Sequence, residues 1–296
     1  MVNVLVSTYN GEQYIREQLD SILDQTYPDI RIYVRDDGST DGTMKILWEY
    51  SERDEIRLIK GRNVGYGRSF LRLLKIAKEG DYWCFCDQDD VWLPDKVKWA
   101  VEWLETQPTG VPALFGNAYE LTDETLEKSL GEVLPPKYDL NFRRALTDCV
   151  YMGFAMTING PLRALMLEAD INQITSHDWW AQILAERFGV HHFDDRIAVR
   201  HRRLDTSISG MSMKNRFKWL GHTLRTGDTG IRSCARAYTE AYGTKMNDRA
   251  AKYAKWFSSK HYRPDYALLK ALYPGRWRPA LSSEAVLRLL MLLGRV

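Results

Sequence analysis

Apolar runs and helical patterns alternate through the first hundred residues of the chain. Four short runs of apolar or alternating residues predict strands at residues 2–7, 30–36, 56–59 and 81–86. Apolar positions at helical spacing predict helices at residues 12–25, 43–50 and 69–77, and a further helix that begins at Pro94 and Asp95. This order predicts an α/β, Rossmann-like fold with a mainly parallel sheet and helices on both of its faces.

The pattern is less regular after residue 110, where Pro112, Pro135 and Pro136 interrupt it. Beyond this stretch we expect strands at residues 150–158 and 190–193, and helices at residues 161–168 and 178–188. After Gly210 the sequence becomes helical, basic and aromatic. Two parts are therefore expected, a body at residues 1–210 and a helical basic module at residues 211–296.

Polar residues follow three of the predicted strands at the point where each strand ends. Ser7, Thr8, Tyr9 and Asn10 close the first strand, residues 36–42 close the second, and Asp87, Gln88, Asp89 and Asp90 close the fourth. The carboxyl ends of parallel strands meet at one edge of a sheet, where open α/β folds bind ligands. Three close acids repel one another unless a cation neutralises them, and Mg²⁺ combines carboxylates with phosphate oxygens. The alternative is a solvated acidic turn, with residues 36–42 as a turn and helix cap.

Two further segments carry candidate chemistry. Residues 62–68 place glycines and arginines before a helix, an arrangement that can hold phosphate but that also occurs in plain loops. Residues 177–180 read His-Asp-Trp-Trp. Asp178 could act as a general base on an acceptor hydroxyl while the two tryptophans form a sugar-binding wall, the alternative being that Asp178 only caps a helix.

Together these segments resemble the motifs of family 2 glycosyltransferases with the GT-A fold. The Asp-Gln-Asp-Asp-Val-Trp and His-Asp-Trp-Trp forms are similar to those of bacterial rhamnosyltransferase-like members, and the resemblance covers residues 1–210. It implies an inverting single displacement with Mg²⁺ or Mn²⁺ and a nucleotide-sugar donor, here a dTDP- or UDP-hexose with rhamnose as first choice. It further implies a glycan or a polyprenyl-diphosphate-linked acceptor in bacterial surface polysaccharide synthesis.

The resemblance also assigns roles to residues. Asp37 would read the base, Asp87 and Asp89 would form the metal-binding pair with Asp89 as the direct ligand, and Asp178 would be the catalytic base. The implied donor-binding residues are Ser7, Thr8, Tyr9, Asn10, Asp37, Asn63, Arg68, Asp87 and Gln88, and the implied acceptor-binding residues are Gly153, Met156, His177, Trp179 and Trp180. One position departs from the family pattern, because Leu204 stands where members often carry a metal- or diphosphate-binding His. His201 or the neighbouring arginines would then compensate, or Asp89 and the donor would hold the metal alone.

Charge is divided unevenly along the chain. Residues 1–199 contain 21 Lys and Arg against 33 Asp and Glu, whereas residues 200–296 contain 20 against 6. Such asymmetry predicts a basic module that meets an anionic surface, either nucleic acid or membrane. Basic residues interleave with aromatic ones from Lys214 to Arg225, and an apolar segment from Ala285 to Leu293 is too short to span a bilayer. We expect peripheral attachment to the inner face of the membrane, the alternative being packing on the body or on a second subunit in a homodimer.

The cysteines and the start of the chain indicate the compartment. Cys84, Cys86, Cys149 and Cys234 form no CxxC pair, which disfavours zinc and favours reduced thiols in the cytoplasm. The chain enters a strand directly, so no secretory signal is expected.

Two other functions fit parts of the sequence. A nucleotidyltransferase also pairs an α/β sheet with carboxylates and Mg²⁺, but a Gly-rich basic loop would be expected after the first strand, where Glu12, Gln13 and Tyr14 stand. A nucleic-acid-binding protein would use the basic C-terminal third, but the acidic, motif-bearing body argues against it. We therefore expect no nucleic-acid partner.

Overall fold

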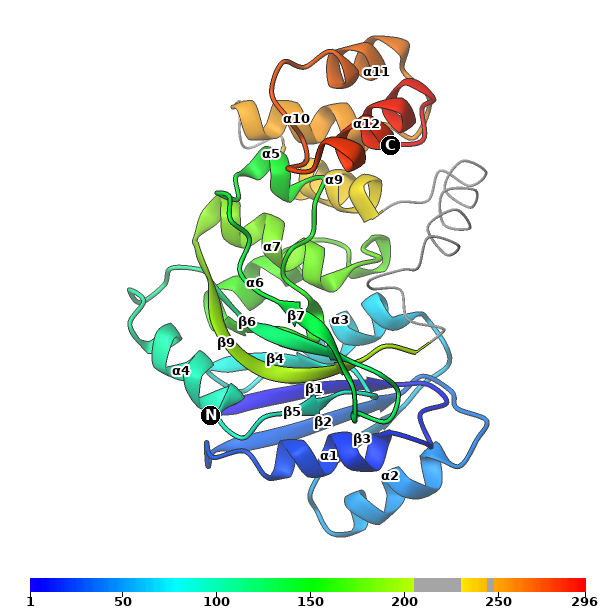
Figure 1. Ribbon diagram of the computed structural model, residues 1–296, viewed down its shortest axis with the longest axis vertical. Coiled ribbons are helices and arrows are strands. Elements are labelled where there is room, and N and C mark those ends of the chain that lie inside the picture. Colours follow the sequence, from blue (N-terminus) through cyan, green and yellow to red (C-terminus); the bar gives the residue numbers. More distant parts are fainter. Residues whose placement is uncertain (205–229, 244–247) are drawn as a thin grey trace.

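The computed structural model describes residues 1–204, 230–243 and 248–296, and its sheet lies beneath a cap of C-terminal helices (Figure 1). The N-terminal half contains β1 (Val2–Thr8), α1 (Ile15–Leu23), β2 (Ile30–Asp36), α2 (Thr43–Glu52), β3 (Arg57–Lys60), α3 (Tyr66–Ile76), β4 (Tyr82–Cys86), β5 (Val91–Trp92) and α4 (Lys96–Glu105). The middle contains β6 (Ala113–Thr122), β7 (Ser129–Val133), α5 (Phe142–Ala145), the 3₁₀ turn η1 (Gly153–Ala155), β8 (Met156–Asn159), α6 (Gly160–Glu168), the 3₁₀ turn η2 (Ile171–Gln173), α7 (His177–Phe188) and β9 (Val190–Arg202). The C-terminal helices are α9 (Gly230–Ala241), α10 (Arg249–Ser258), α11 (Pro264–Ala271) and α12 (Leu281–Leu292).

The sheet is mixed, in the order β3-β2-β1-β4-β8-β6-β9-β5, with β7 paired to β6. β3, β2, β1 and β4 run parallel, as the alternating sequence predicts. β1 is central because its apolar run Val4, Leu5 and Val6 is buried completely, which suits a strand covered on both faces. The ends of β1, β2 and β4 therefore meet at one edge of the sheet.

The irregular stretch after residue 110 contains a long strand that the sequence pattern did not reveal. β6 pairs parallel to β9 and antiparallel to β8, and β9 continues to Arg202, well past the predicted residues 190–193. Gly116 interrupts the apolar run of β6, and a Cβ atom there would lie 2.6 Å from Cδ1 of Tyr151. The glycine thus lets the Tyr151 ring pack on the strand.

The predicted strand at residues 150–158 is wrong in its first half. A 3₁₀ turn replaces it, closed by a hydrogen bond of 3.0 Å from Ala155 N–H to the Met152 carbonyl, and β8 begins only at Met156. A Cβ atom at Gly153 would lie 2.5 Å from Nε2 of His177, so only glycine lets the turn approach α7 this closely. The turn carries residues 152–154 to the edge of the sheet where the acidic loop ends.

The C-terminal helices pack on the body. Trp277 is buried completely, its carbonyl accepts from Thr147 Oγ1 at 2.9 Å, and Arg278 Nε donates to the Thr147 carbonyl at 2.8 Å. One hydrophobic core joins Trp180 of α7 to Tyr238 of α9 and to Trp277. The predicted boundary near residue 210 and the basic segment from Lys214 to Arg225 lie outside the described residues.

Candidate active site

A cleft of about 670 Å³ lies at the edge of the sheet where β1, β2 and β4 end. It is lined by Ser7, Thr8, Tyr9, Asp37, Asn63, Gly65, Tyr66, Asp87, Gln88, Asp89, Met152, Gly153, Phe154, His177, Asp178 and His201. The structure thus brings together most of the residues that the sequence assigns to donor, metal and catalysis. Tyr66, from the candidate segment at residues 62–68, also lines the cleft, as do Met152 and Phe154, to which the motifs did not point.

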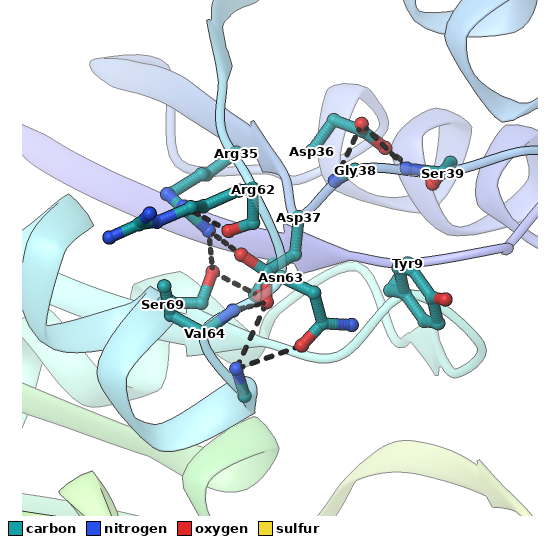
Figure 2. Close-up of polar contacts among 12 residues, drawn as sticks. Tyr9, Arg35, Asp36, Asp37, Gly38, Ser39, Arg62, Asn63, Val64 and Ser69 are labelled. Carbon is teal, nitrogen blue, oxygen red and sulfur yellow. Dashed lines mark hydrogen bonds and ion pairs between the residues drawn. The ribbon is translucent and has the colours of Figure 1, made fainter.

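Asp37 is held in place by three donors at the end of β2 (Figure 2). Arg35 binds Oδ1, while the backbone N–H groups of Val64 and Gly65 donate to Oδ2 at 2.8 and 3.1 Å. An ionised carboxylate has about four lone-pair sites, so one site remains for a ligand. Asp37 is therefore a pre-positioned acceptor at the cleft wall.

Arg35 connects this acceptor to the neighbouring strand. Its Nη1 donates to Ser69 Oγ at 3.0 Å, and Ser69 Oγ accepts from Ser7 Oγ at 2.6 Å. Sequence reasoning missed Arg35 and Ser69. The available signal was a charged residue within an otherwise buried strand.

Gln88 fastens the loop after β1 to the acidic loop. Its Oε1 accepts from Thr8 Oγ1 at 2.7 Å and from Tyr9 N–H at 2.8 Å. Asn10 ties the same loop to the turn after β2, because its Oδ1 accepts from Thr40 N–H at 2.8 Å. These contacts leave the half-exposed ring of Tyr9 on the cleft wall.

Asp87 and Asp89 face the cleft, whereas Asp90 turns inward to His201. Burial, with the charges of Asp90 and Asp89, raises the pKa of Asp87 well above its usual value. Burial and the charge of Asp90 raise the pKa of Asp89 to about 6. Both shifts are those expected of crowded carboxylates that lack a counter-cation.

His201 packs against the acidic loop. Its Nδ1 lies 2.7 Å from Oδ1 of Asp90, and its ring stacks on Phe154 with centroids 4.2 Å apart. Burial disfavours the charged ring, but Asp90, aided by Asp87 and Asp89, outweighs this and raises the pKa of His201. His201 therefore lies against the acidic loop and lines the cleft.

The donor set fits a hard divalent cation only in part. Carboxylate oxygens suit Mg²⁺ or Mn²⁺, and the raised pKa values show that a cation beside Asp87 and Asp89 would relieve repulsion. Within residues 1–204, 230–243 and 248–296, no cluster of three or more His, Cys, Asp or Glu side chains is arranged to hold a metal. The two aspartates would thus need donor phosphate oxygens to complete the coordination.

Asp178 stands in the first turn of α7 and lines the cleft. Ser176 Oγ and the Trp179 backbone N–H donate to its Oδ1 at 2.6 and 2.8 Å. In the part of the chain that the structure describes, both donors bind Oδ1, which leaves Oδ2 for a substrate hydroxyl. This geometry suits a general base.

Two of the predicted acceptor contacts are corrected by the structure. Trp180 is buried completely, with its Nε1 donating to the Met166 carbonyl at 3.1 Å, and Met156 is buried completely in β8. Neither side chain can contact an acceptor.

Trp179 donates from Nε1 to the Ala145 carbonyl at 2.6 Å, and Arg68 donates from Nε to the Asn172 carbonyl at 2.9 Å. These last two, with Asn10, are not among the residues that line the cleft.

His177 is expected to contribute to the pH dependence of stability in mild acid. The ring packs between Phe70 and Phe85, and both of its nitrogens are buried without a partner among the described residues. Burial, only partly offset by Asp178, lowers the pKa of His177 to about 4, against about 6.5 for an exposed His. Below about pH 6.5 the unfolded chain binds a proton that the folded chain does not, so the free energy of unfolding falls as the pH drops toward 4.

Replacing His177 should therefore make the free energy of unfolding less dependent on pH in mild acid. His177→Gln should remove a loss of about 2 kcal/mol that the wild type shows between pH 7 and pH 5. Urea unfolding at both pH values measures this difference. The exposed His261→Gln is the matched control and should keep the wild-type dependence, whereas an unchanged dependence in His177→Gln would contradict the assignment.

Comparison with solved structures shows the fold. S. aureus TarS in complex with UDP-GlcNAc matches with a TM-score of 0.56 at 16% identity, over 99% of this chain and 89% of that chain. The mannosyltransferase PcManGT from Pyrobaculum calidifontis, in complex with GDP-Man and Mn²⁺, matches with a TM-score of 0.53 at 17% identity, over 99% and 84%. The fold is that of the GT-A glycosyltransferases, as the sequence predicted.

Sequence comparison gives the family. The family model for glycosyl transferase family 2 matches residues 3–163. The dTDP-rhamnosyl transferase RfbG of Shigella flexneri is 30% identical over 232 residues, 73% of this chain and 78% of RfbG. The putative teichuronic acid biosynthesis glycosyltransferase TuaG of Bacillus subtilis is 25% identical over 72% of this chain and 83% of TuaG. The chain belongs to glycosyl transferase family 2, and the predicted enzyme class is confirmed.

Proposed function

We propose that this enzyme transfers a hexose, rhamnose as first choice, from a dTDP- or UDP-hexose to a glycan or polyprenyl-diphosphate-linked acceptor, with inversion, in bacterial surface polysaccharide synthesis. One observation carries the proposal: Asp37, the pair Asp87 and Asp89, and Asp178 line a single cleft. A hydrogen-bond acceptor for the nucleobase, a cation-binding pair and a candidate catalytic base thus share one cleft. The names of RfbG and TuaG support the donor and the pathway class.

Each side chain then has a defined task. The remaining lone pair of Asp37 accepts the imide N–H of thymine or uracil, and Tyr9 stacks on the base. Asp87 and Asp89 would hold Mg²⁺ or Mn²⁺, which when bound offsets the charge that develops on the diphosphate leaving group. Asp178 Oδ2 removes the proton of the acceptor hydroxyl. The hydroxyl oxygen then attacks the anomeric carbon from the face opposite the nucleoside diphosphate, which leaves. His201 holds Asp90 beside the pair and lines the same cleft.

The donor nucleotide can be identified by competition. We expect dTDP and UDP to displace a labelled nucleotide-sugar at lower concentration than GDP, because the single free lone pair of Asp37 suits one pyrimidine imide. A nucleotide-sugar at about 100 times its dissociation constant should stabilise the protein by about 2.7 kcal/mol. Thermal shift with a panel of UDP-, dTDP- and GDP-sugars, with Mg²⁺ or Mn²⁺, ranks the candidates, and rhamnose transfer is then scored by mass spectrometry. Tighter binding of GDP would overturn the donor assignment.

We further propose that the helices after residue 210 hold the enzyme on the inner face of the membrane, where a lipid-linked acceptor would lie. No helix within the described residues combines the length and apolar character that crossing a bilayer requires. Family membership sets aside the nucleotidyltransferase and nucleic-acid-binding alternatives.

A further inference from the structure

The outward side of α12 carries no charged residue. Its exposed positions include Leu281, Val286, Leu289 and Leu292, and Leu281 is 68% exposed. Its two charged residues instead point toward the protein, where Arg288 Nε donates to Glu284 Oε1 at 2.6 Å. This is the reverse of a helix that faces water, which places its charges outward.

The inward charges are used in packing. Buried Glu284 accepts from the backbone N–H groups of Trp277 and Arg278 at 3.0 and 2.8 Å. Arg288 donates to the carbonyls of Ala271 and Gly275 at 2.6 and 3.0 Å. The orientation of α12 is therefore fixed by polar contacts, and its apolar side cannot turn inward without breaking them.

α11 adds a second row of exposed leucines beside α12. Leu268 and Leu269 are about half exposed, and Leu272, directly after the helix, is 74% exposed. Arg288 joins α12 to Ala271, and Tyr262 Oη donates to the Leu292 carbonyl at 3.0 Å, so the two helices lie side by side (Figure 1). We call the exposed apolar residues of these two neighbouring helices the leucine face: Leu268, Leu269, Leu272, Leu281, Val286, Leu289, Leu292 and Leu293.

The charge around the leucine face is positive. Residues 260–296 contain seven Lys and Arg against two acids, Asp265 and Glu284. Both acids are paired with arginines, Asp265 with Arg263 at 2.7 Å and Glu284 with Arg288. Exposed Lys260 and Arg276 remain to attract anions, at about 1 kcal/mol for each basic residue near an anionic bilayer.

We infer that the leucine face docks on an anionic phospholipid surface, with its leucines at the boundary between headgroups and acyl chains. This inference rests on the proposed function, because a lipid-linked acceptor is what would make docking on a membrane useful. A second copy of the chain fits less well, because a two-fold contact would bring two positively charged surfaces together. α12 is about 18 Å long, too short for the ~30 Å apolar core of a bilayer, so the helix would lie along the surface.

The test is flotation of the full chain with lipid vesicles. Wild type should float with vesicles that contain phosphatidylglycerol, and much less with phosphatidylcholine alone. The triple variant Leu268→Gln, Leu272→Gln and Leu289→Gln should lower binding at least about tenfold, since each exposed leucine contributes apolar area to the contact. The matched control is Leu23→Gln, Ile76→Gln and Leu134→Gln, which changes leucine and isoleucine side chains of 43–51% exposure elsewhere and should float like wild type.

A second variant tests the charge. Arg276→Glu should weaken flotation with anionic vesicles and leave thermal stability unchanged, which separates docking from folding. Wild type that stays unbound, or a triple variant that floats like wild type, would overturn the inference. The inference would also be overturned if sedimentation showed a dimeric wild type and a monomeric triple variant, and neither protein bound vesicles. Flotation needs neither donor nor acceptor. A failure of sugar transfer would therefore count against the proposed reaction without affecting the flotation result.

Discussion

Asp178→Asn is expected to lower the rate of sugar transfer by about 10²- to 10⁴-fold, the usual cost of losing a general base. Asparagine keeps the shape of the side chain, and its Oδ1 can still accept from Ser176 Oγ and the Trp179 N–H. What is lost is the anionic Oδ2 that would take the proton of the acceptor hydroxyl. The fold and the affinity for the donor should therefore be retained.

Transfer to a soluble acceptor, measured under saturating donor, gives the rate, and calorimetry gives the donor affinity. Asp195→Asn removes an exposed carboxylate of β9 that does not line the cleft, and it should transfer at the wild-type rate. Near-normal turnover in Asp178→Asn would show that another group is the base.

Asp89→Asn should remove the metal-dependent part of donor binding. Neutralising a charge on the leaving group is worth several kcal/mol, and in our proposal this depends on the anionic oxygens of Asp87 and Asp89. Titration of dTDP or UDP with Mn²⁺ and with EDTA should show a large difference in affinity for wild type and a small one for the variant. Glu102→Gln, an exposed position on α4, serves as the control and should behave as wild type.

The pH dependence of metal affinity is an additional check on the same residue. The pKa of Asp89 is raised to about 6, so protons compete with the metal below that pH. Affinity for Mn²⁺ should therefore rise as the pH increases through 6. Donor binding by wild type that EDTA does not affect would show that the cleft works without metal and that the role given to Asp89 is wrong.

The sequence predicted the parallel half of the sheet well because its signals are local. In β1 and β4 an uninterrupted apolar run is followed at once by polar residues, so both the strand and its functional end are visible. β6 escaped detection because its pairing with β9 and β8 is long-range and Gly116 breaks its apolar run. Non-local pairing leaves no periodic trace within a short window.

In the candidate site, too, residues with a local sequence signal were predicted and one that depends on packing was not. Asp37, Asp89 and Asp178 were found from their motifs, and all three line the cleft. The error on Trp180 arose from reading two adjacent tryptophans as one surface, although neighbours on a helix point in different directions. Trp180, Ile183 and Leu184 are spaced as a buried stripe and are all buried completely, which is the signal that would have placed Trp180 in the core.

The core that joins α7 to Tyr238 and Trp277 has a consequence for how the enzyme is made. A ribosome releases the N-terminal part of a chain first, and domains usually fold as they emerge. Here the helix that carries Asp178 cannot bury its outer side until residues 238 and 277 have been synthesised. The nascent chain must therefore hold a finished sheet beside an uncovered apolar surface, and completion of the catalytic wall waits until residue 277 has been synthesised.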